Sequence, residues 1–525
     1  QSLNSELDVT SVGLLERDQQ GKGDIYSYNF WSSPVSSVNA TAINEPYSID
    51  EVLRDGTDAN NLQNITWTTG YNGAPTTPIT LSSYWLFTFD NQVEDYGSWQ
   101  QVNQTQDVKV GLGYTMKGSG SGATSNSQNY TFVGKPNNGD ISHALAAANT
   151  SLLGNPYPSA LDADQFILDN IGVIEEDGDA IGAGVTTGAL YFWEHFATNN
   201  SHILAEYHGG YATYNLSGAT MAIPDPMVSS NGTGSVLPKR YIPVGQGFFV
   251  EGGEGGTVQF NNGQRIFKKE SGGESVFTKS SEVVSSTNSN VSPARSDINR
   301  LYFNVSFSNG LQRQILLAEK EGTTQGVDFG YDAKLLDLNP TDVSWSLSDD
   351  TYVIQTIGEI TDELEVPLHV KSVSEGVAHF SIEELQGIAP EVEIYFVDKQ
   401  TSIYTDLREG AVEFNMETGN SSDRYAVVFR ITEEVLDVED VIKSTDDLVV
   451  FYNIGTHSVQ INNASSFSAK NITLYNLLGQ EVLLSKKEYA KVNEISIPVS
   501  VATGTYLARF DYNDGTMITK KLIIK

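Results

Sequence analysis

The sequence of 525 residues contains no cysteine. This absence excludes disulfide bonds, thiolate zinc sites and cysteine nucleophiles. An exported protein without disulfides must be held together by the packing of its core. With 39% hydrophobic and 10% aromatic residues, the chain has the composition of a globular protein that can bury such a core.

Basic residues are scarce. The chain has 31 Lys and Arg against 66 Asp and Glu, which gives a formal net charge of −35. Binding to nucleic-acid phosphates and docking on an anionic membrane both depend on clusters of Lys and Arg. We therefore expect no nucleic-acid partner and no docking on an anionic membrane surface.

Long apolar runs are also missing. No segment reaches the roughly 18 to 20 apolar residues that a membrane helix needs, so we expect no direct membrane span. The N-terminal residues, beginning at Gln1, lack the basic region and apolar stretch of a signal peptide. We expect the sequence to be a mature form or the ordered part of a longer protein.

The charge is distributed unevenly, and this predicts the domain boundaries. Residues 1–290 carry 12 basic and 30 acidic side chains, residues 291–440 carry 10 and 29, and residues 441–525 carry 9 and 7. Residues 278–296 are rich in Ser, Asn and Thr, which is typical of a solvated linker. We predict an aromatic-rich β domain at 1–277, the linker at 278–296, a β-sandwich at 297–434, and a C-terminal module at 441–525.

The local pattern is mostly β. Short aromatic and β-branched runs, bounded by Gly, Asn and Asp, predict strands at Leu301–Phe307, Ala378–Ile382, Val392–Val397, Tyr425–Phe429 and Tyr506–Phe510. One helix is predicted at Ala160–Asn170, starting from a capping-box-like Ser159-Ala-Leu-Asp162. The fold class expected is all-β, with tandem β-sandwich domains ending in a small Ig-like sandwich of seven strands.

Three motifs stand in the last 85 residues. They are Asn471-Ile-Thr-Leu-Tyr-Asn-Leu-Leu-Gly-Gln-Glu-Val482, Gly504-Thr-Tyr-Leu-Ala-Arg509 and Lys520-Lys-Leu-Ile-Ile-Lys525. In order and spacing, this module resembles the type A C-terminal sorting domain, which marks cargo of the type IX secretion system in Bacteroidetes. It departs from many members in reading Phe451-Tyr-Asn-Ile-Gly-Thr456 where they have a Pro-Asn-Pro turn.

The resemblance implies partners and a location. It implies recognition by the type IX translocon and an outer-membrane shuttle barrel, and a final state that is secreted or attached to the outer surface of the outer membrane. We expect the terminal strand and its lysines to be recognised, because a strand edge and a cationic end can dock on a partner sheet. The residues predicted to form the sorting signal are Asn471, Leu474, Tyr475, Asn476, Gly479, Gln480, Gly504, Tyr506, Lys520, Lys521 and Lys525.

The two upstream regions also resemble known sequences. Residues 297–434, with Asn299-Arg-Leu-Tyr-Phe303 and Asp423-Arg-Tyr-Ala-Val-Val-Phe429, resemble a β-sandwich that often precedes such sorting domains, which implies a spacer or presentation domain. Residues 1–277, with Leu153-Gly-Asn-Pro-Tyr-Pro-Ser159 and Ile242-Pro-Val-Gly-Gln-Gly-Phe-Phe-Val250, resemble a region that recurs in large Bacteroidetes surface proteins. Neither resemblance implies a chemical activity.

Clusters of His, Asp and Glu in the sequence are candidates for metal sites. One cluster comprises Glu194, His195, His202, Glu206 and His208. If Leu190–Phe196 and Ile203–Tyr207 pair as a hairpin, His195 and His202 face each other near its turn, and His and Glu together could hold zinc or iron. Asp177 and Asp179 lie in a Gly-rich loop whose oxygen ligands suit calcium. The alternative for the histidine cluster is that these residues are polar members of an aromatic-rich sheet. The alternative for Asp177 and Asp179 is a solvated loop without a metal. We therefore predict no cofactor.

The sequence also offers candidates for a hydrolytic site and for a sugar-binding site. Paired carboxylates could drive glycoside hydrolysis. The candidates are Asp162 with Asp164, and the group of Glu175, Glu176, Asp177 and Asp179. Two positions apart on a helix, Asp162 and Asp164 are expected to point to different faces. Trp85, Tyr96, Trp99 and Tyr114 could form a sugar-binding platform, with the filling of a large core as the alternative.

The function predicted is that of a non-catalytic exported protein, adhesive or structural, whose C-terminal domain is its export signal. A carbohydrate-binding component of extracellular polysaccharide utilisation is the first alternative, and a carboxylate-dependent secreted hydrolase is the second. No G-x-S-x-G elbow, P-loop or H-E-x-x-H motif is present in the sequence.

Overall fold

The structure is a computed structural model. It describes residues 11–120, 127–174, 180–181, 184–196, 199–224, 232, 234–269, 275, 297–431, 448–453, 456–463, 468–476, 479–485, 489–490, 494–512 and 517–524. The predicted linker at 278–296 lies outside these residues. The chain divides into two compact units, Gln1–Glu433 and Glu434–Lys525, each of which is built from short, mostly antiparallel strands.

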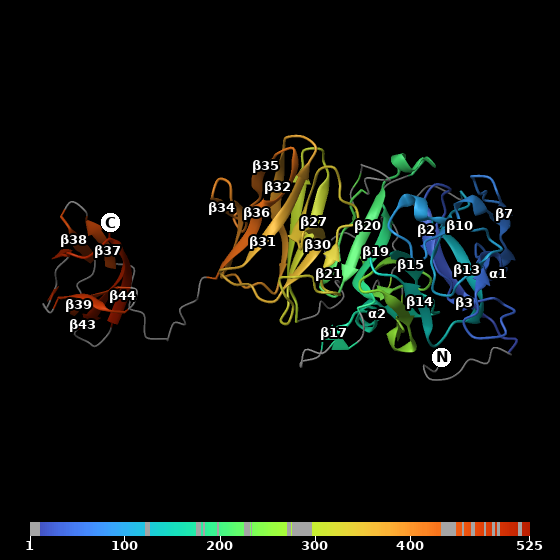
Figure 1. Ribbon diagram of the computed structural model, residues 1–525, viewed down its shortest axis with the longest axis horizontal. Coiled ribbons are helices and arrows are strands. Elements are labelled where there is room, and N and C mark those ends of the chain that lie inside the picture. The colour runs from blue at the N-terminus through green and yellow to red at the C-terminus, as the bar shows by residue number, and fades with distance from the viewer. Residues whose placement is uncertain are drawn as a thin grey trace. The chain divides into compact units, whose positions relative to one another are not determined.

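The N-terminal part of the first unit contains three main sheets (Figure 1). One comprises β1 (Leu15–Lys22), β13 (Ser127–Pro136), β5 (Leu53–Asp55), β6 (Gln63–Asn64) and β3 (Val35–Ser36). The second has the order β10 (Gln100–Gln101), β9 (Phe87–Thr88), β12 (Tyr114–Lys117) and β2 (Tyr28–Trp31). The third has the order β15 (Thr150–Gly154), β23 (Gly247–Gly252), β19 (Thr186–His195), β20 (Gly209–Asn215) and β21 (Gly218–Thr220).

Small sheets complete this part of the unit. They pair β4 (Tyr47–Ser48) with β11 (Asp107–Val108), β7 (Thr66–Thr68) with β8 (Thr80–Ser82), β14 (Ile141–Leu145) with β24 (Gly256–Phe260), β17 (Val173–Ile174) with β18 (Ala180–Ile181), and β16 (Ala160–Asp162) with β22 (Tyr241–Ile242) and β25 (Arg265–Ile266).

One large sheet follows residue 297. Its strands are, in spatial order, β34 (Ile403–Asp406), β33 (Val392–Asp398), β36 (Gly419–Ile431), β31 (Glu365–Ser372), β29 (Asp342–Leu347), β30 (Asp350–Ile357), β27 (Gln312–Glu319), β26 (Asn299–Phe307), β32 (Gly376–Gln386) and β35 (Val412–Met416), with β28 (Ala333–Lys334) beside β30. The strands predicted between residues 301 and 429 are confirmed here.

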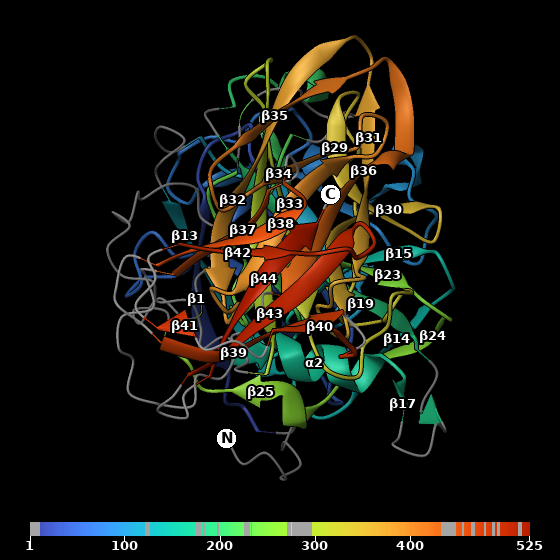
Figure 2. The same cartoon turned by 90° about the vertical axis from the view of Figure 1, so that its left-hand side faces the viewer.

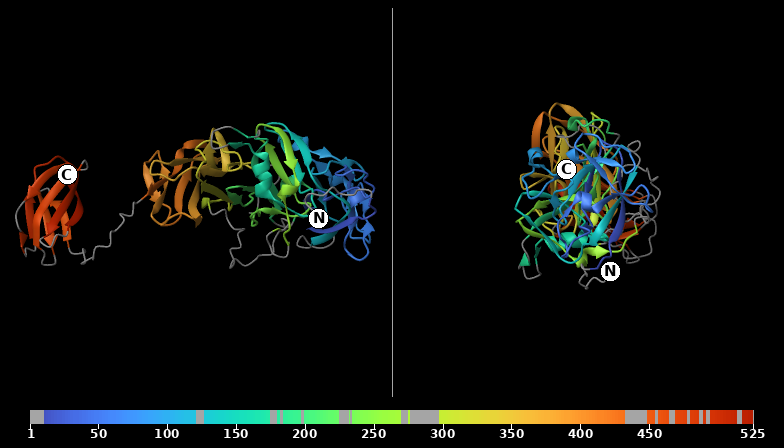
Figure 3. Two further views of the ribbon diagram at one scale, coloured as in Figure 1. Left: turned by 90° about the horizontal axis from the view of Figure 1, so that it is seen from below. Right: turned by 90° about the vertical axis from the view of Figure 1, so that its right-hand side faces the viewer.

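The regions on either side of residue 297 share a core within the first unit. One buried cluster joins Phe30, Trp193 and Phe249 to Phe303 and Trp345. In Figure 3, the yellow and orange strands of the large sheet lie beside the green strands around residue 200. Burial of this continuous apolar surface stabilises the two regions together, at roughly 25 cal/mol per Å².

Helices are few and short. They are α1 (Ile49–Val52), α2 (Ala163–Asn170) and the 3₁₀ turns η1 (Ser83–Trp85), η2 (Tyr96–Ser98), η3 (Leu204–Glu206) and η4 (Asn262–Gln264). None of the helices in the described part of the chain reaches the length and hydropathy needed to cross a membrane.

The predicted helix exists, but its predicted start was wrong. The N-cap of α2 is Asp162, whose carboxylate accepts a hydrogen bond from the amide of Asp164 at 3.2 Å. Ala160–Asp162 form β16 instead, because Leu161 pairs with Ile242 and Arg265. Phe166 and Ile167 are buried, as expected from the apolar face of the helix.

The C-terminal unit contains the seven strands predicted for it, together with the two-residue strand β41 (Figure 2). A three-stranded sheet has the order β37 (Leu448–Asn453), β38 (Ser458–Asn463) and β42 (Glu494–Pro498). A five-stranded sheet comprises β40 (Glu481–Ser485), β39 (Ser468–Asn476), β43 (Gly504–Tyr512), β44 (Met517–Ile524) and β41 (Tyr489–Ala490). Buried residues of both sheets form one cluster.

Candidate ligand-binding site

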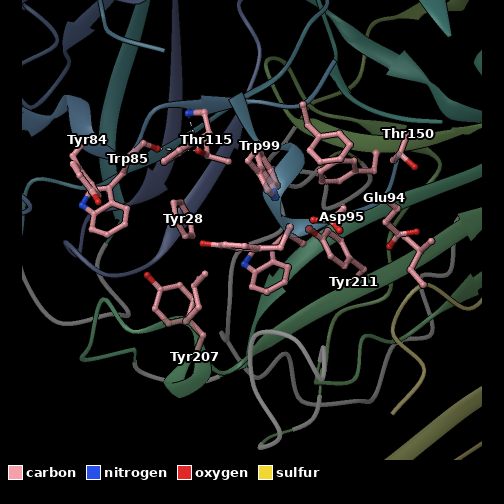
Figure 4. A pocket seen from close by; sticks show the side chains of 17 residues that line it. Tyr28, Tyr84, Trp85, Glu94, Asp95, Trp99, Thr115, Thr150, Tyr207 and Tyr211 are labelled. Carbon is pink, nitrogen blue, oxygen red and sulfur yellow. Dashed lines mark hydrogen bonds between the residues drawn. The ribbon is translucent and has the colours of Figure 1, made fainter. Parts of the chain in front are cut away.

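An aromatic pocket of about 340 Å³ opens in the first unit (Figure 4). This volume lies at the lower end of the range of ligand pockets, about 300–1,000 Å³. Its lining side chains are Tyr28, Tyr84, Trp85, Phe87, Phe89, Glu94, Asp95, Tyr96, Trp99, Thr115, Thr150, Trp193, Leu204, Tyr207, Tyr211, Phe249 and Leu336. Three of the four residues predicted as an aromatic platform, Trp85, Tyr96 and Trp99, are among them.

Strand alternation explains why these side chains converge. On β12, Tyr114 and Met116 point into one buried cluster, whereas Thr115 lies on the opposite face and lines the pocket. On β19, Leu190 and Phe192 belong to that same cluster, while Trp193 faces the pocket. Tyr114 is therefore a core residue, and its assignment to the platform was wrong.

Edge-to-face packing holds the aromatic wall rigid. The Trp99 ring centroid lies 5.3 Å from that of Phe89 and 5.8 Å from that of Phe249, and the Tyr211 ring stands at 90° to Phe249. Such pairs contribute about 0.5–1.5 kcal/mol each beyond their burial. The pocket thus presents preformed ring faces to a ligand.

A buried lysine lies behind one wall of the pocket. The Lys117 ammonium nitrogen is 3.6 Å from the Trp85 ring centroid and 4.4 Å from that of Tyr28, and it donates a hydrogen bond to the Tyr207 hydroxyl. Burial lowers the pKa of Lys117 to about 7. Burial also raises the pKa of the Tyr28 hydroxyl far above its usual range, so this ring stays neutral.

One end of the pocket is acidic (Figure 4). Glu94 and Asp95 line it, and Asp95 also caps η2 by accepting a hydrogen bond from the Gly97 amide at 2.6 Å. Lys334 lies within electrostatic range of Glu94, but it binds Asp350 at 2.8 Å and approaches Glu251 at 3.9 Å. Carboxylates therefore outnumber cations at this end.

In the C-terminal unit, several predicted signal residues are structural. Leu474 is buried in the core, and so is most of Tyr506, whose hydroxyl donates to the Ala502 carbonyl at 2.7 Å. This bond is similar to the tyrosine corner of Ig-like domains. Tyr475 lies beneath Arg509, whose guanidinium carbon is 5.5 Å from its ring centroid.

Three other signal residues form the turn between β39 and β40. The Gln480 amide donates to the Asn476 side chain at 2.9 Å, and the Asn476 side chain donates back to the Gln480 side chain at 2.9 Å. Gly479 has a φ of 76°, which favours glycine. The motif Asn476…Gly479-Gln480 therefore specifies a loop conformation.

The remaining signal residues lie along the strands. Asn471 pairs with Asp511 on β43, and Gly504 pairs with Ile524. Lys520 is half-buried and Lys521 is exposed on β44, which is the end strand of its sheet. Lys525 lies outside the described residues.

Comparison with known families identifies both units. Residues 2–429 match the family described as a domain of unknown function (DUF8693), which covers most of the chain. The chain belongs to the DUF8693 family. Residues 453–525 match the secretion system C-terminal sorting domain, which confirms the resemblance drawn from the three motifs. The protein is thus cargo of the type IX secretion system and interacts with that machinery. A search of curated proteins finds no match.

The histidine hairpin predicted in the DUF8693 region was wrong. β19 pairs with β20 (209–215) and not with residues 203–207, so His195 lies opposite Gly209. His195 is buried and contacts the Trp193 indole nitrogen at 3.0 Å, and burial lowers its pKa to about 3. His202 instead stacks on Trp85 and lies 3.2 Å from the Lys117 amine.

The other metal candidates do not gather in the described residues. Within these residues, no group of three or more His, Asp or Glu side chains is placed to hold a metal ion. Glu194 accepts a hydrogen bond from the Ser235 amide at 3.0 Å, and burial raises its pKa to about 7. Glu175, Glu176, Asp177 and Asp179 lie outside the described residues.

The carboxylate pair of the DUF8693 region is bound by an arginine. Arg240 contacts Asp162 at 2.8 Å and Asp164 at 3.3 Å, so the expectation that the two point to different faces was wrong. They converge because Asp162 is the N-cap and not a residue within the helix. Arg240 thus joins the two carboxylates in one ion-pair cluster.

Sequence reasoning missed much of the pocket. Tyr28, Glu94 and Tyr207 line it, but they are far apart in the chain and match no motif. The only signal was the density of aromatic residues, since five of the six tryptophans stand in residues 1–277.

Proposed function

We propose that this type IX cargo is a non-catalytic binding protein whose DUF8693 unit holds a carbohydrate in the aromatic pocket. The observation that supports this is the combination of rigid ring faces, such as Trp99 and Tyr211, with polar groups at one end of the pocket, such as Glu94. Flat apolar faces suit the C–H face of a sugar ring, and carboxylates accept hydrogen bonds from its hydroxyls. An adhesive role at the cell surface follows from such binding.

A glycan array probed with the full chain tests the proposal. We expect binding that Trp99→Ala abolishes, because the variant removes a central ring of the wall. Tyr404→Ala is the matched control, since Tyr404 is an exposed tyrosine on β34 that does not line the pocket. Equal binding by Trp99→Ala and the parent protein, or no binding at all, would contradict the proposal.

We also propose that the protein lacks glycosidase activity at Asp162 and Asp164. A catalytic carboxylate must be able to contact its substrate, whereas Arg240 already binds Asp162 at 2.8 Å and Asp164 at 3.3 Å. We expect no hydrolysis across a panel of polysaccharides. Turnover that disappears in Asp162→Asn would show the opposite.

For export, we propose that the shuttle barrel recognises the edge of β44 and its lysines. An end strand offers unpaired backbone groups to a partner sheet. The whole segment 520–525 is a poor target for deletion, because Leu522 and Ile524 belong to the core. Lys520→Glu with Lys521→Glu reverses the charge and keeps these apolar residues.

We expect this double variant to accumulate inside the cell while retaining the unfolding temperature of the parent. Localisation by cell fractionation gives the readout. Normal secretion to the medium or the outer surface would remove the lysines from the signal.

A further inference from the structure

An exposed aromatic shelf continues the pocket onto the protein surface. Tyr71 and Tyr84 are 58% and 38% exposed, and their ring centroids are 4.6 Å apart. Tyr84 also lines the pocket, whereas Tyr71 does not. Trp85 connects the two regions, since its ring centroid lies 4.7 Å from that of Tyr84. The three rings therefore form one edge-to-face cluster that reaches from the pocket lining to the open surface.

The shelf is fixed before any ligand arrives. The Trp85 indole nitrogen donates to the Tyr71 carbonyl at 2.7 Å, the Ser82 hydroxyl to the Gly70 carbonyl at 2.5 Å, and the Ser83 hydroxyl to the Thr68 carbonyl at 3.2 Å. Three side-chain donors within residues 82–85, around η1, thus hold the loop that carries Tyr71. A pre-ordered surface binds without the entropic cost of ordering it.

The pocket itself is elongated. Figure 4 shows Tyr84 and Trp85 at one end and Glu94 and Thr150 at the other, with Tyr28 and Trp99 between them. The shelf adjoins the end formed by Tyr84 and Trp85. A ligand that fills the pocket can therefore extend out of it over Tyr84 and Tyr71.

Charge narrows the class of ligand. The 17 described side chains that line the pocket include two carboxylates and neither lysine nor arginine. The nearby Lys117 is directed at Tyr207 and Trp85, and Lys334 is engaged by Asp350. An anionic sugar at this acidic end would meet Glu94 and Asp95, and no lysine or arginine among the described lining residues would balance its charge.

We propose that the site takes an uncharged oligosaccharide of at least two sugar units, with one part in the pocket and the next unit on the shelf formed by Tyr71 and Tyr84. This rests on the carbohydrate-binding function proposed above. It adds that the bound glycan is a chain rather than a single sugar, and that acidic glycans are rejected.

Isothermal titration of the full chain tests this inference. The probes are gluco-, manno- and xylo-oligosaccharides of one to four units and oligogalacturonates of the same lengths. We expect affinity to rise from one unit to two or three, and the anionic series to bind at least about ten-fold more weakly than the neutral series.

Two variants locate the determinants. Tyr71→Ala should weaken trimer binding by about two- to ten-fold and leave monomer binding unchanged, because a stacked ring contributes only to the longer ligand. Glu94→Gln should narrow the gap between the neutral and the anionic series, and it leaves the η2 cap made by Asp95 in place. Tyr404→Ala serves as the exposed-tyrosine control, and the unfolding temperature confirms that each variant folds.

The outcomes separate this inference from the function on which it rests. No binding by any saccharide would overturn carbohydrate binding itself. Saccharide binding that is independent of chain length and of Tyr71, or that favours oligogalacturonate, would overturn the inference and leave carbohydrate binding in place.

Discussion

The two units of this protein bury different kinds of side chain. In the DUF8693 unit, Arg313 is enclosed with Asp342 and Asp337, and Lys117 is enclosed by aromatic rings. Within the described residues of the sorting domain, the buried polar side chains are only Ser458, Gln460 and Thr473, and its core is mostly aliphatic. Apolar packing thus dominates the described interior of the sorting domain, whereas the DUF8693 unit also encloses charged groups.

Burying polar groups in the larger unit costs desolvation free energy and places Lys117 next to the pocket. Removing ionised groups from water is expensive unless each finds a partner, and replacing such groups by apolar ones is often stabilising. Lys117 lies directly behind the pocket wall, so here the polar interior lies beside the site that we propose to be functional. This difference between the two units can be tested by substitutions in each of them.

The largest effect is expected from Asp342→Ala. Arg313 is 2% exposed in its side chain and binds Asp342 at 2.6 Å, so the variant leaves a buried guanidinium with one of its two carboxylate partners removed. Loss of one partner of a buried pair costs about 3–5 kcal/mol. Urea denaturation should show this loss in the transition of the DUF8693 unit, with the sorting domain unchanged.

A surface ion pair serves as the control for Asp342→Ala. Lys399 binds Glu365 at the same short range, 2.8 Å, but both side chains are substantially exposed. Lys399→Ala should change the free energy of unfolding by less than about 1 kcal/mol. Similar losses in the two variants would mean that burial does not distinguish these pairs.

In the sorting domain, Leu474→Ala should cost about 2–5 kcal/mol, because it opens a cavity in a small core. Leu507→Ala is the matched control on the neighbouring strand, where the side chain is 38% exposed. Thermal unfolding monitored in the sorting domain gives the measurement. A small effect of Leu474→Ala would show that this core tolerates loss of packing. It would contradict the view that the sorting domain is stabilised mainly by apolar burial.

The buried lysine predicts a pH dependence confined to the DUF8693 unit. The pKa of Lys117 is lowered from 10.5 to about 7 in the folded state, so the unfolded chain binds more protons between these values. The stability that depends on neutral Lys117 is present above about pH 10.5 and is lost as the pH falls to about 7. Relative to Lys117→Met, the parent protein should therefore gain stability as the pH rises from 7, by at most about 1.4 kcal/mol per pH unit.

The measurement is the difference in urea midpoint between the parent protein and Lys117→Met at several pH values. The subtraction cancels the titration of other groups. A difference that stays flat between pH 7 and 10 would mean that Lys117 titrates normally.

The smallest effect is expected at the β39–β40 turn of the sorting domain. Gly479→Ala places a Cβ at a φ of 76° and should cost about 1–2 kcal/mol. No atom lies within 4 Å of that added Cβ, so the cost is one of backbone conformation alone. Gly376→Ala, in the strand β32, is the control and should be nearly neutral in thermal unfolding. Equal shifts in the two variants would remove the conformational explanation.

Local signals in the sequence predicted the local structure. Runs such as Val392–Val397 became strands because β-branched and aromatic side chains suit a pleated, half-buried surface. The order and spacing of three motifs led to the sorting domain, because two of them specify a turn at Gly479 and a buried strand at Tyr506. These features depend on neighbours within a few residues.

The pocket could not be predicted in the same way. Its wall depends on the pairing of β12 with β2, which joins residues 114–117 to residues 28–31, and on contact with Leu336. The prediction of the histidine hairpin was wrong for a related reason. β19 does not pair with the nearest apolar run, residues 203–207, but with the next one, β20. Strand periodicity tells which face a residue occupies, but it does not tell which strand lies opposite.

The shared core of the DUF8693 unit has a consequence for the order of folding. Asn339 donates to the Pro224 carbonyl at 2.9 Å, and the hydroxyls of Ser217 and Thr356 meet at 2.7 Å. A growing chain can therefore complete this core only after more than a hundred further residues have been synthesised. Such long-range closure is slow and leaves aromatic surface exposed while it proceeds. The sorting domain, built largely from hairpins, should reach its native state first on refolding, although it is the last part to be made.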